Sequence, residues 1–520
     1  MPRHFIYLVS FLLSFQISPA QSDGLILISN KDIDQNYFTS LITNNYSINH
    51  IWFHPAPVHS TAYIQKDSTL IVPLVINDPI MQIPNHAGGR FQKLNWDGDV
   101  IWEFNFYDTL YTPHHDIDPL PNGNILVICW EVKTKEDAES LGRLSIEDQI
   151  WPTMIVELEP PNGIIVWEWH LWDHLVQDVD SSLPNYGVIS EHPELLDINI
   201  GGPVSNSNGD WLHMNAIQYN EELDQIIFSS RHLNEIFIID HSTTTEEAAG
   251  HSGGNSGKGG DFLFRWGNPM NYERGDIDDR KLVAPHGVNW VQQNFPGSGN
   301  IIIFNNNPND DNTEGNSEVI EIIPPINDNG HYYISSESAY GPDEIQWSHG
   351  GDNTYFSGWQ SGAYRLHNGN TLVTVSQQKY IFEVDNNNEI VWQCHTGGNL
   401  GWVDYPLRVF KLEPSYFLDI PITSSSSSSI FKINQNYPNP FNISTNINYE
   451  LLKDSFITVR VYNIQGEIMT TLIDEWQTAG VYSTKWEGKN QNGKHFSSGI
   501  YFYKIQTDRS FEIKKLTLLK

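Results

Sequence analysis

Short runs of β-branched and aromatic residues, separated by turns rich in Gly, Asn, Asp and Pro, recur along most of the chain. Each repeat has a first apolar run that follows a turn, often a Gly-Asn turn, and a later run that ends in tryptophan. The first runs lie at 25–28, 69–73, 125–128, 225–228, 301–304 and 371–374. The later runs end at Trp52, Trp102, Trp167, Trp266, Trp347 and Trp392. The pattern predicts six copies of one β unit joined by loops of uneven length.

These repeats predict an all-β fold, because helical periodicity is nearly absent and a unit of this size corresponds to a four-stranded propeller blade. Closing the array into a ring protects edge strands that would otherwise pair with other chains. The tryptophans are expected to pack one blade against the next rather than to take part in chemistry. We therefore predict a six-bladed β-propeller over residues 21–414.

The two ends of the chain carry different signals. Residues 1–20 combine Arg3 and His4 with an apolar run and a small-residue cleavage site, which is typical of a signal peptide. Six consecutive serines at 424–429 indicate a flexible linker, placed at 415–430. Residues 431–520 return to alternating strands and predict a small C-terminal β-sandwich. No later stretch has the ~18 apolar residues of a membrane-spanning helix, so no transmembrane segment is expected.

Composition narrows the range of partners. The formal net charge is −34, from 63 acidic and 29 basic residues, which argues against nucleic acid and anionic lipid as partners. No cofactor is expected, although the Asp- and Asn-rich loops at 276–279 and 307–312 either form plain turns or hold structural calcium. The two cysteines, Cys129 and Cys394, lie far apart and are read as buried free thiols, with a single closing bridge as the alternative.

Polar residues that start or occupy the predicted innermost strands are the candidates for chemistry, because propellers bind ligands at the central channel. Four places stand out: His114-His115-Asp116, then 210–215 with 229–231, then Pro285-His286-Gly287 with Asn305-Asn306, and 357–365. A single histidine at a strand end is usually a structural hydrogen-bond donor. Similar placement in successive repeats, however, would bring three imidazoles and one guanidinium into one channel. Such a cationic pocket suits an oxyanion.

The C-terminal segment resembles a known export module. Its motifs are Asn436-Tyr437-Pro438-Asn439-Pro440-Phe441-Asn442, Val461-Tyr462-Asn463-Ile464-Gln465-Gly466, Ser498-Gly499-Ile500-Tyr501-Phe502-Tyr503 and a basic end at Lys514-Lys515. They are similar to the C-terminal sorting domain of the type IX secretion system, over 431–520. The resemblance implies that the type IX machinery is a partner and that the protein crosses the periplasm and the outer membrane. It would then be secreted or held at the cell surface, and such domains are commonly removed.

The propeller region resembles the arylsulfate sulfotransferases that do not use the nucleotide sulfate donor. The motifs are His114-His115-Asp116-Ile117 with Leu120-Pro121-Asn122-Gly123-Asn124, Trp172-Asp173-His174 with Pro193-Glu194-Leu195, Trp211-Leu212-His213-Met214-Asn215, Ser229-Ser230-Arg231-His232, and Trp266-Gly267-Asn268 with His286. The resemblance implies a six-bladed propeller acting on small aryl sulfates and phenols. It implies a transient sulfohistidine at His286, further catalytic roles for His115, His213 and Arg231, and substrate contact by Asn215.

Elementary chemistry agrees with such a mechanism. A neutral imidazole is a competent nucleophile, and a positive surrounding keeps it unprotonated. Arg231, His213 and His115 would stabilise the charge on the moving sulfuryl group, and one histidine would exchange a proton with the phenol. Strand alternation lets only one of His114 and His115 face the channel. We favour His115, because the adjacent Asp116 could fix its tautomer.

Three other functions remain open. Three histidines can bind zinc, but the metal-hydrolase motifs are absent. The glycine-rich stretch 253–259 has the wrong spacing for a phosphate-binding loop and is expected to be a plain loop. The main alternative to the enzyme is a noncatalytic secreted propeller that binds glycans or proteins at the cell surface.

Overall fold

The computed structural model describes residues 22–76, 87–201, 209–308, 316–327, 329–336, 338–352, 354–413, 431–433, 435–463, 468–490, 493–507 and 511–519. The predicted signal peptide (1–20) and the serine-rich linker (415–430) lie outside them, as does 309–312 of one candidate calcium loop. Regular structure is almost entirely β, and the α-helices in the described residues are the short α1 (Lys135–Ser140) and α2 (Thr245–Ala248). The prediction of an all-β fold is confirmed.

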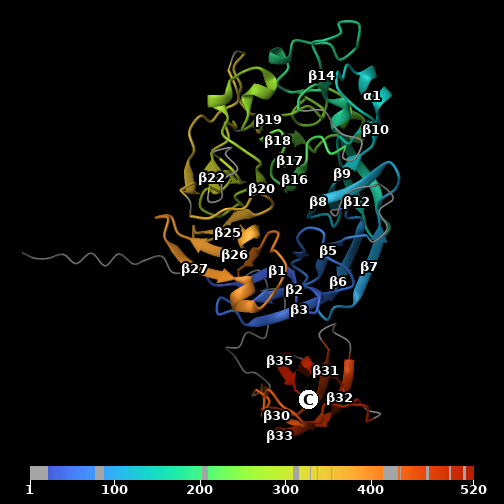
Figure 1. The fold of residues 1–520 in the computed structure, drawn as a ribbon, viewed down its shortest axis with the longest axis vertical. Helices are drawn as coiled ribbons and strands as arrows, with labels where there is room; N and C mark the ends of the chain where they lie inside the picture. The colour runs from blue at the N-terminus through green and yellow to red at the C-terminus, as the bar shows by residue number, and fades with distance from the viewer. Residues whose placement is uncertain are drawn as a thin grey trace, which may run out of the picture.

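Four-stranded antiparallel sheets follow one another around a centre, and Figure 1 looks into this ring. Three of them are built from strands of the N-terminal half, except that β28 from residues 410–412 joins the first. They contain β28 (Phe410–Leu412), β1 (Leu25–Lys31), β2 (Tyr37–Ile42) and β3 (Ile48–His54); β4 (Tyr63–Ile64), β5 (Leu70–Leu74), β6 (Arg90–Leu94) and β7 (Val100–Asn105); and β8 (Tyr111–Pro119), β9 (Ile125–Glu131), β12 (Thr153–Glu159) and β13 (Ile164–His170).

Three further sheets continue the ring. They contain β16 (Met214–Asn220), β17 (Gln225–Ser230), β18 (Glu235–Asp240) and β19 (Phe264–Trp266); β20 (His286–Trp290), β21 (Ile301–Asn305), β22 (Glu318–Ile322) and β23 (Trp347–Gly350); and β24 (Gly362–Arg365), β25 (Thr371–Val375), β26 (Tyr380–Val384) and β27 (Ile390–His395). Two-stranded additions are β10 (Lys133–Thr134) with β11 (Gln149–Ile150) and β14 (Leu175–Val176) with β15 (Leu196–Asp197).

The ring is closed by strands from the two ends of the propeller chain. β28 pairs antiparallel with β1, with Leu25 opposite Leu412. The first sheet therefore takes its innermost strand from residues 410–412 and its other three strands from residues 25–54. Because this pairing joins segments almost four hundred residues apart, the pocket residues near β28 reach the centre only when the ring closes.

The predicted role of the tryptophans is confirmed, because all six pack in apolar clusters between sheets and the indole N–H groups of four of them donate to a neighbouring sheet. The acceptors are Asn95 O for Trp52 (3.0 Å), Thr243 Oγ1 for Trp167 (3.2 Å), Pro342 O for Trp266 (2.9 Å) and Asn44 O for Trp392 (2.7 Å). Apolar clusters fill the same spaces between sheets. One cluster joins Leu126, Ile155, Phe228 and Phe237, from the sheets of β9 and β17. Each blade is thus stabilised mainly by burying apolar surface against the next one.

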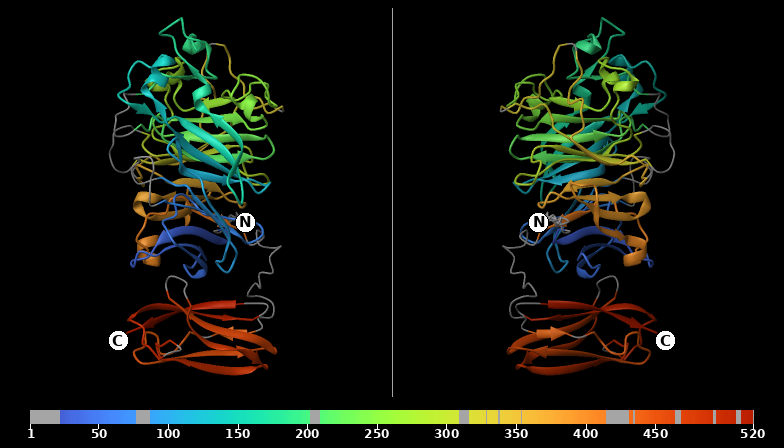
Figure 2. Two further views of the ribbon diagram at one scale, coloured as in Figure 1. Left: turned by 90° about the vertical axis from the view of Figure 1, so that its right-hand side faces the viewer. Right: turned by 90° about the vertical axis from the view of Figure 1, so that its left-hand side faces the viewer.

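The C-terminal part forms two further sheets, drawn in orange and red in Figures 1 and 2. One contains β29 (Phe431–Ile433), β30 (Thr445–Leu451) and β33 (Gly480–Trp486). The other contains β32 (Ile468–Gln477), β31 (Ser455–Tyr462), β34 (Gly499–Gln506) and β35 (Phe511–Leu518). A core that includes Ile447, Val459 and Trp486 lies between them. This is the β-sandwich that the sequence predicts.

Three smaller expectations have structural answers. Cys129 and Cys394 are both buried and free, so the closing bridge is absent. In the 276–279 loop the Asp276 carboxylate accepts from Asp278 N (2.9 Å), while the Asp279 carboxylate accepts from Asp276 N (2.9 Å), as in a capped turn. Within the described ranges, no helix combines the length and the apolar character that crossing a membrane requires.

Candidate active site

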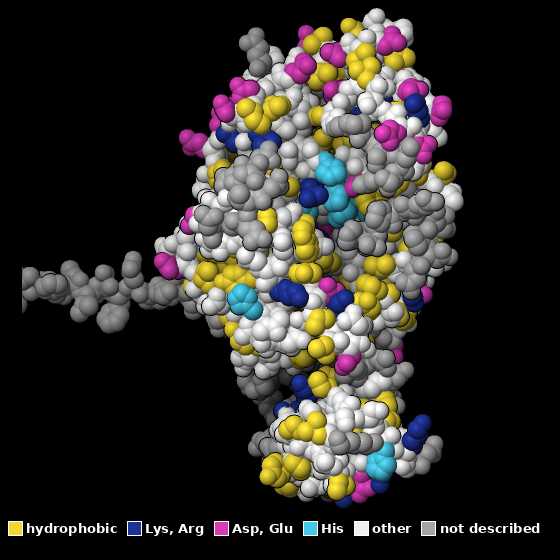
Figure 3. Space-filling model, viewed as in Figure 1, with side chains coloured by type: hydrophobic (Ala, Val, Ile, Leu, Met, Phe, Trp, Pro, Cys, Tyr) yellow, Lys and Arg dark blue, Asp and Glu magenta, His cyan; other side chains and the backbone are white. Residues whose placement is uncertain are grey.

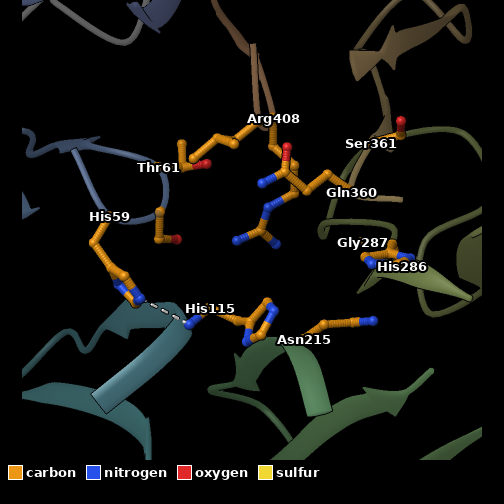
Figure 4. A pocket seen from close by; sticks show the side chains of 11 residues that line it. His59, Thr61, His115, Asn215, His286, Gly287, Gln360, Ser361 and Arg408 are labelled. Carbon is orange, nitrogen blue, oxygen red and sulfur yellow. Dashed lines mark hydrogen bonds between the residues drawn. The ribbon is translucent and has the colours of Figure 1, made fainter. Parts of the chain in front are cut away.

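The innermost strands of all six sheets begin at one small polar cavity. Strands β8, β16, β20 and β24 contact one another in sequence at the centre of the ring. The cavity has a volume of about 30 Å³ and is lined by His59, Ser60, Thr61, His115, Asn215, His286, Gly287, Gln360, Ser361, Leu407 and Arg408. Figure 4 shows these side chains converging from separate strands. In Figure 3, histidine and basic side chains gather over the same central region.

Irregular backbone at the strand starts turns these side chains toward the cavity. The pairing register shifts between Pro113 and Ile117, between Met214 and Ala216, and between His286 and Asn289. Bulges of this kind change the direction of a side chain and are frequent beside active sites.

Left-handed backbone occurs at the same places. The φ angles are +56° at His115, +51° at His213, +53° at Gln360 and +83° at Ser361. A Cβ on Gly287, whose φ is +59°, would lie 2.7 Å from Gly362 Cα. Such positions are unfavourable for residues other than glycine and cluster at functional sites.

His286, the first residue of β20, has a defined tautomer. Its Nδ1 lies 2.8 Å from Asn306 Oδ1 and 3.0 Å from Ala284 O, two groups that can only accept. The Asn306 amide is itself fixed, since its Nδ2 donates to Ser357 O (2.6 Å) and Gln360 O (3.0 Å). Nδ1 therefore carries the proton, and Nε2 carries the lone pair.

The surroundings of His286 keep it neutral. Burial, together with the positive fields of His213 and Arg231, lowers its pKa from 6.5 to about 3. The hydrogen bonds from Nδ1 act in the opposite direction but do not offset these effects. At neutral pH the ring is therefore an uncharged base in a cationic environment.

His115 lies across the cavity and His114 does not line it. The His114 ring is fully buried and stacks on Trp130 at a centroid distance of 4.0 Å, and burial lowers its pKa to about 3. The His115 backbone N–H donates to Nε2 of His59 (3.0 Å), and the two Nδ1 atoms of His114 and His115 are 2.8 Å apart. The structure thus places His115 at the cavity and gives His114 a packing position.

The predicted reason for favouring His115 is wrong. The buried carboxylate of Asp116 accepts from Ser60 Oγ (3.0 Å), from Ile217 N (2.8 Å) and from Arg408, instead of fixing the His115 tautomer. The carboxylate therefore links the fourth sheet to residues that lie just before the innermost strands of the second and first sheets. Its main electrostatic role is to hold Arg408.

His213 and Arg231 lie beside the cavity rather than in its lining. The His213 ring is 4.4 Å from the His115 ring, centroid to centroid, and Arg231 N donates to His213 O (3.1 Å). Nδ1 of His213 is 2.5 Å from Asp210 Oδ2. Although burial raises the pKa of Asp210, the bond and positive charge of His213 lower it to about 2, so this carboxylate stays ionised.

Arg231 has one guanidinium nitrogen with no hydrogen-bond partner in the described part of the chain. This nitrogen is the buried Nε, whereas Nη2 reaches Gly358 O at 3.5 Å, near the start of β24. Burial lowers the pKa of Arg231, and the charge of Asp210 raises it. A buried donor without a partner is unfavourable unless a ligand completes it.

Asn215 lines the cavity but its amide is already engaged. Nδ2 donates to Pro285 O (2.9 Å), and Oδ1 accepts from Ser229 Oγ (2.6 Å). The side chain therefore also holds the segment that carries His286. Arg365, in the fourth candidate region, pairs with Glu321 outside the cavity, whereas Gln360 and Ser361 of that region line it.

Sequence reasoning missed His59 and Arg408. Arg408 extends among the cavity residues in Figure 4, and the charge of Asp116 holds its pKa above the ordinary value despite burial. Neither residue belongs to one of the motifs singled out above. The one usable signal was their position just before the innermost strands of the second and first sheets, and Arg408 precedes a strand that is recognisable only from ring closure.

Two family models match this chain. The family model described as arylsulfotransferase (ASST) matches residues 81–381, which is more than half of the chain and includes His115, His213, Arg231 and His286. A model described as a secretion system C-terminal sorting domain matches 435–518. This domain indicates export by the type IX secretion system to the cell surface or beyond. A search of the curated proteins finds no match.

Solved structures resemble the chain only weakly. They include a protein of unknown function from Bacteroides caccae, with a TM-score of 0.39 and 10% identity over 75% of this chain and 99% of that one. A periplasmic gluconolactonase from Pseudomonas aeruginosa has a TM-score of 0.36 and 9% identity over 89% and 99%. These similarities are too low to bear on function. From the family match, supported by a cationic site at the centre of the ring, we conclude that the chain belongs to the arylsulfotransferase family.

Proposed function

We propose that the protein transfers a sulfuryl group from an aryl sulfate to a phenol by a double displacement through a sulfohistidine at His286. The observation that carries the proposal is the tautomer and the charge of His286. Its Nδ1–H is held by Asn306 and Ala284, its Nε2 keeps the lone pair, and its pKa of about 3 leaves it neutral at working pH. A buried, neutral and oriented imidazole is what a nucleophile at sulfur requires.

In the first displacement, Nε2 of His286 attacks sulfur, the N–S bond forms and the bond from sulfur to the aryl oxygen breaks. The electron pair leaves with the phenolate, which takes a proton from a neighbouring histidine. In the second displacement the acceptor phenol returns a proton to that histidine as its oxygen attacks sulfur. The N–S bond then breaks, and its electron pair restores neutral His286.

The neighbouring cations would stabilise the transferred group. Sulfuryl transfer, like phosphoryl transfer, depends mainly on positioning and on charge stabilisation at the equatorial oxygens. Arg231 offers its partnerless Nε, and His115 and His213 lie on the same side of the ring with their rings 4.4 Å apart. His213, paired with Asp210, is our candidate for the proton exchange with the phenol.

A second cavity supports the aryl part of the proposal. The central cavity of about 30 Å³ has room for the sulfuryl group but not for an aromatic ring. A cavity of about 250 Å³ shares His59, Gln360 and Leu407 with it. Its lining includes Tyr37, Trp359 and Tyr405, and the rings of Trp359 and Tyr405 are 5.0 Å apart in an edge-to-face arrangement. Aromatic walls beside an anion site fit an aryl sulfate.

The test combines turnover with detection of the intermediate. Purified protein is mixed with p-nitrophenyl sulfate, with and without a phenol, and a rapidly quenched sample without acceptor is searched by mass spectrometry for sulfonated His286. We expect sulfonation and acceptor-dependent nitrophenol release, both lost in His286→Ala and kept in His395→Ala, which changes an exposed ring. Continuous release without any acceptor, beyond one equivalent per protein, would point to a sulfatase, and normal turnover without modified His286 would remove the covalent scheme.

The route of export is part of the proposal. We infer that the chain crosses the periplasm, loses residues 1–20, and is delivered across the outer membrane with removal of the 435–518 domain. The mass of the mature protein, measured after expression in a host with the type IX system, tests both cleavages. A mature protein that retains 435–518 would contradict removal of the sorting domain.

A further inference from the structure

A second cluster of histidine and aspartate lies at the outer part of the ring, away from the central cavity. It consists of His174, which follows a 3₁₀ turn (Leu171–Asp173) after β13, and of His251 and Asp261, which flank the glycine-rich stretch between α2 and β19. One ligand atom from each of the three lies within 4.8 Å of the others. We propose that this cluster is a binding site for a divalent transition metal, with Zn²⁺ as the best fit.

The ring of His174 is hydrogen bonded at both nitrogens, and its Nδ1 faces the Asp261 carboxylate. Its Nε2 lies 2.8 Å from Ala248 O, which can only accept, so this nitrogen carries the proton. Its Nδ1 lies 2.8 Å from Asp261 Oδ1, and His251 Nδ1 lies 2.7 Å from the same oxygen. Two imidazole nitrogens therefore converge on one carboxylate oxygen, and a metal ion bound there would replace the protons between these atoms.

The ligand atoms, and the hydrogen bond that orients His174, are those of a zinc site. Zn²⁺ takes imidazole nitrogen and carboxylate oxygen at about 2.0–2.2 Å, and ligand histidines commonly donate their other N–H to a carbonyl. The Ala248 carbonyl has this supporting role for His174. Ligand atoms around zinc are about 3.2 Å apart, so the two nitrogen–oxygen distances of 2.8 and 2.7 Å would each lengthen by a few tenths of an ångström.

Burial gives the cluster one closed and one open side. The side chain of His174 is fully buried and that of Asp261 is 8% exposed, whereas that of His251 is 61% exposed. Water can therefore complete the metal coordination beside His251. A buried His-Asp pair also resists loss of the ion, because its removal leaves charged and polar groups inside the protein.

The glycine-rich stretch that lacks phosphate-loop spacing has a structural role in this site. Gly259 N donates to Gly253 O (3.0 Å) and Gly260 N to Gly250 O (3.0 Å), which brings both ends of the loop together. A Cβ on Gly260 would lie 2.0 Å from Ala248 O and 2.6 Å from His174 Nε2. Glycine is needed there so that the loop can close on the His174 ring. A metal would fasten this loop to the neighbouring blade.

The test uses the full chain, freed of metal by chelation and titrated with Zn²⁺ by calorimetry, with Co²⁺ absorption to report coordination geometry. We expect one high-affinity site, a Co²⁺ spectrum of tetrahedral type, and a thermal-unfolding midpoint that rises by several degrees with Zn²⁺. His251→Ala, at an exposed position, should weaken the affinity at least about 10-fold and abolish the spectrum. Asp261→Asn should do the same, and p-nitrophenyl sulfate turnover should be unchanged in His251→Ala.

A matched control separates this site from a similar cluster near the cavity. Asp210, His213 and His232 also place three ligand atoms within 4.8 Å of one another. His232→Ala removes the exposed histidine of that cluster and should leave the affinity and the Co²⁺ spectrum unchanged. Absence of binding by the unmodified chain would overturn the proposal. Loss of binding in His232→Ala with retention in His251→Ala would overturn it as well, by placing the metal near the cavity.

Discussion

Two histidines of the propeller, one buried and one partly buried, are held in opposite charge states. His286, at the central cavity, has its pKa lowered by burial and by His213 and Arg231 to about 3. His241 lies at the end of β18, where Nδ1 contacts Asp224 and Nε2 contacts Glu157, each at 2.9 Å. Burial lowers the pKa of His241, but these two carboxylates raise it to about 9. The same side chain is therefore a neutral base at the centre and a cation at the periphery.

The partners of each ring set the direction of its pKa, and His286 is also the more deeply buried of the two. His286 is hydrogen bonded by an amide and a carbonyl, His213 by one carboxylate and His241 by two. Carboxylates stabilise the imidazolium, whereas neutral acceptors fix the tautomer with little effect on charge. A nucleophile needs neutral partners, as at His286. One carboxylate suits a group that donates and accepts a proton, as we propose for His213, and two carboxylates suit a structural cation such as His241.

The largest effect on activity is expected when His286 is given a carboxylate partner like those of His241. Asn306→Asp puts a carboxylate next to Nδ1 and removes the amide N–H groups that bind Ser357 O and Gln360 O. The pKa of His286 should rise toward or above its ordinary value. We expect sulfuryl transfer at pH 7 to fall about 100-fold or more and to recover partly as the pH rises.

The measurement is kcat/KM for p-nitrophenyl sulfate from pH 5 to 9. Asn387→Asp, which adds the same charge at an exposed turn, serves as the control and should be silent. An Asn306→Asp variant with unchanged activity at pH 7 would argue against a requirement for neutral His286.

A smaller effect is expected from removing the single carboxylate beside His213. Asp210 stays ionised at all working pH values, since its pKa lies at about 2. Asp210→Asn keeps the shape but removes the negative charge beside His213, so we expect kcat/KM to fall about 10- to 100-fold. Substrates with a better leaving group should be less affected, because they need less help from a proton donor. Equal losses for all leaving groups would assign Asp210 a purely structural role.

His241 should affect stability and leave catalysis unchanged. A pKa raised from 6.5 to about 9 adds stability that is complete below pH 6.5 and is lost as the pH rises through about 9. The difference in unfolding free energy between the unmodified protein and His241→Gln should therefore shrink, by on the order of 2 kcal/mol, between pH 6 and pH 9. Urea unfolding at both pH values measures it, and a pH-independent difference would contradict the carboxylate-bound cation.

The smallest effect is expected in the cavity of about 250 Å³ that Tyr37, Trp359 and Tyr405 line, because the substitution there changes no titrating group. Trp359→Ala removes one wall against which the aryl group would pack. We expect KM for p-nitrophenyl sulfate to rise about 5-fold with little change in kcat, since roughly 1 kcal/mol of ring contact is lost. A fall in kcat at constant KM would place the aryl group elsewhere.

Much of the fold could be predicted from local signals, and less of the site. The tryptophans that end the β runs mark the contacts between blades, as the indole bond from Trp392 to Asn44 O illustrates. His115 and His286 were found because each lies in a short motif, His115 within His114-His115-Asp116 ahead of the turn at 121–124 and His286 within Pro285-His286-Gly287. His59 and Arg408 were missed, because each lies outside the motifs and outside the matched range 81–381. The contact of Asp116 was predicted wrongly, since its partner Arg408 lies 292 residues away.

The sequence by itself determined the repeating β units, the separate C-terminal sandwich and the motifs that carry the family resemblance. These are local properties, because strand alternation, turn residues and short motifs act over a few positions. Only the tertiary structure decided which nitrogen of His286 carries its proton, which partner Asp116 takes and which of the two adjacent histidines lines the cavity. Those outcomes depend on groups that ring closure brings together from opposite ends of the chain, and no local pattern contains them.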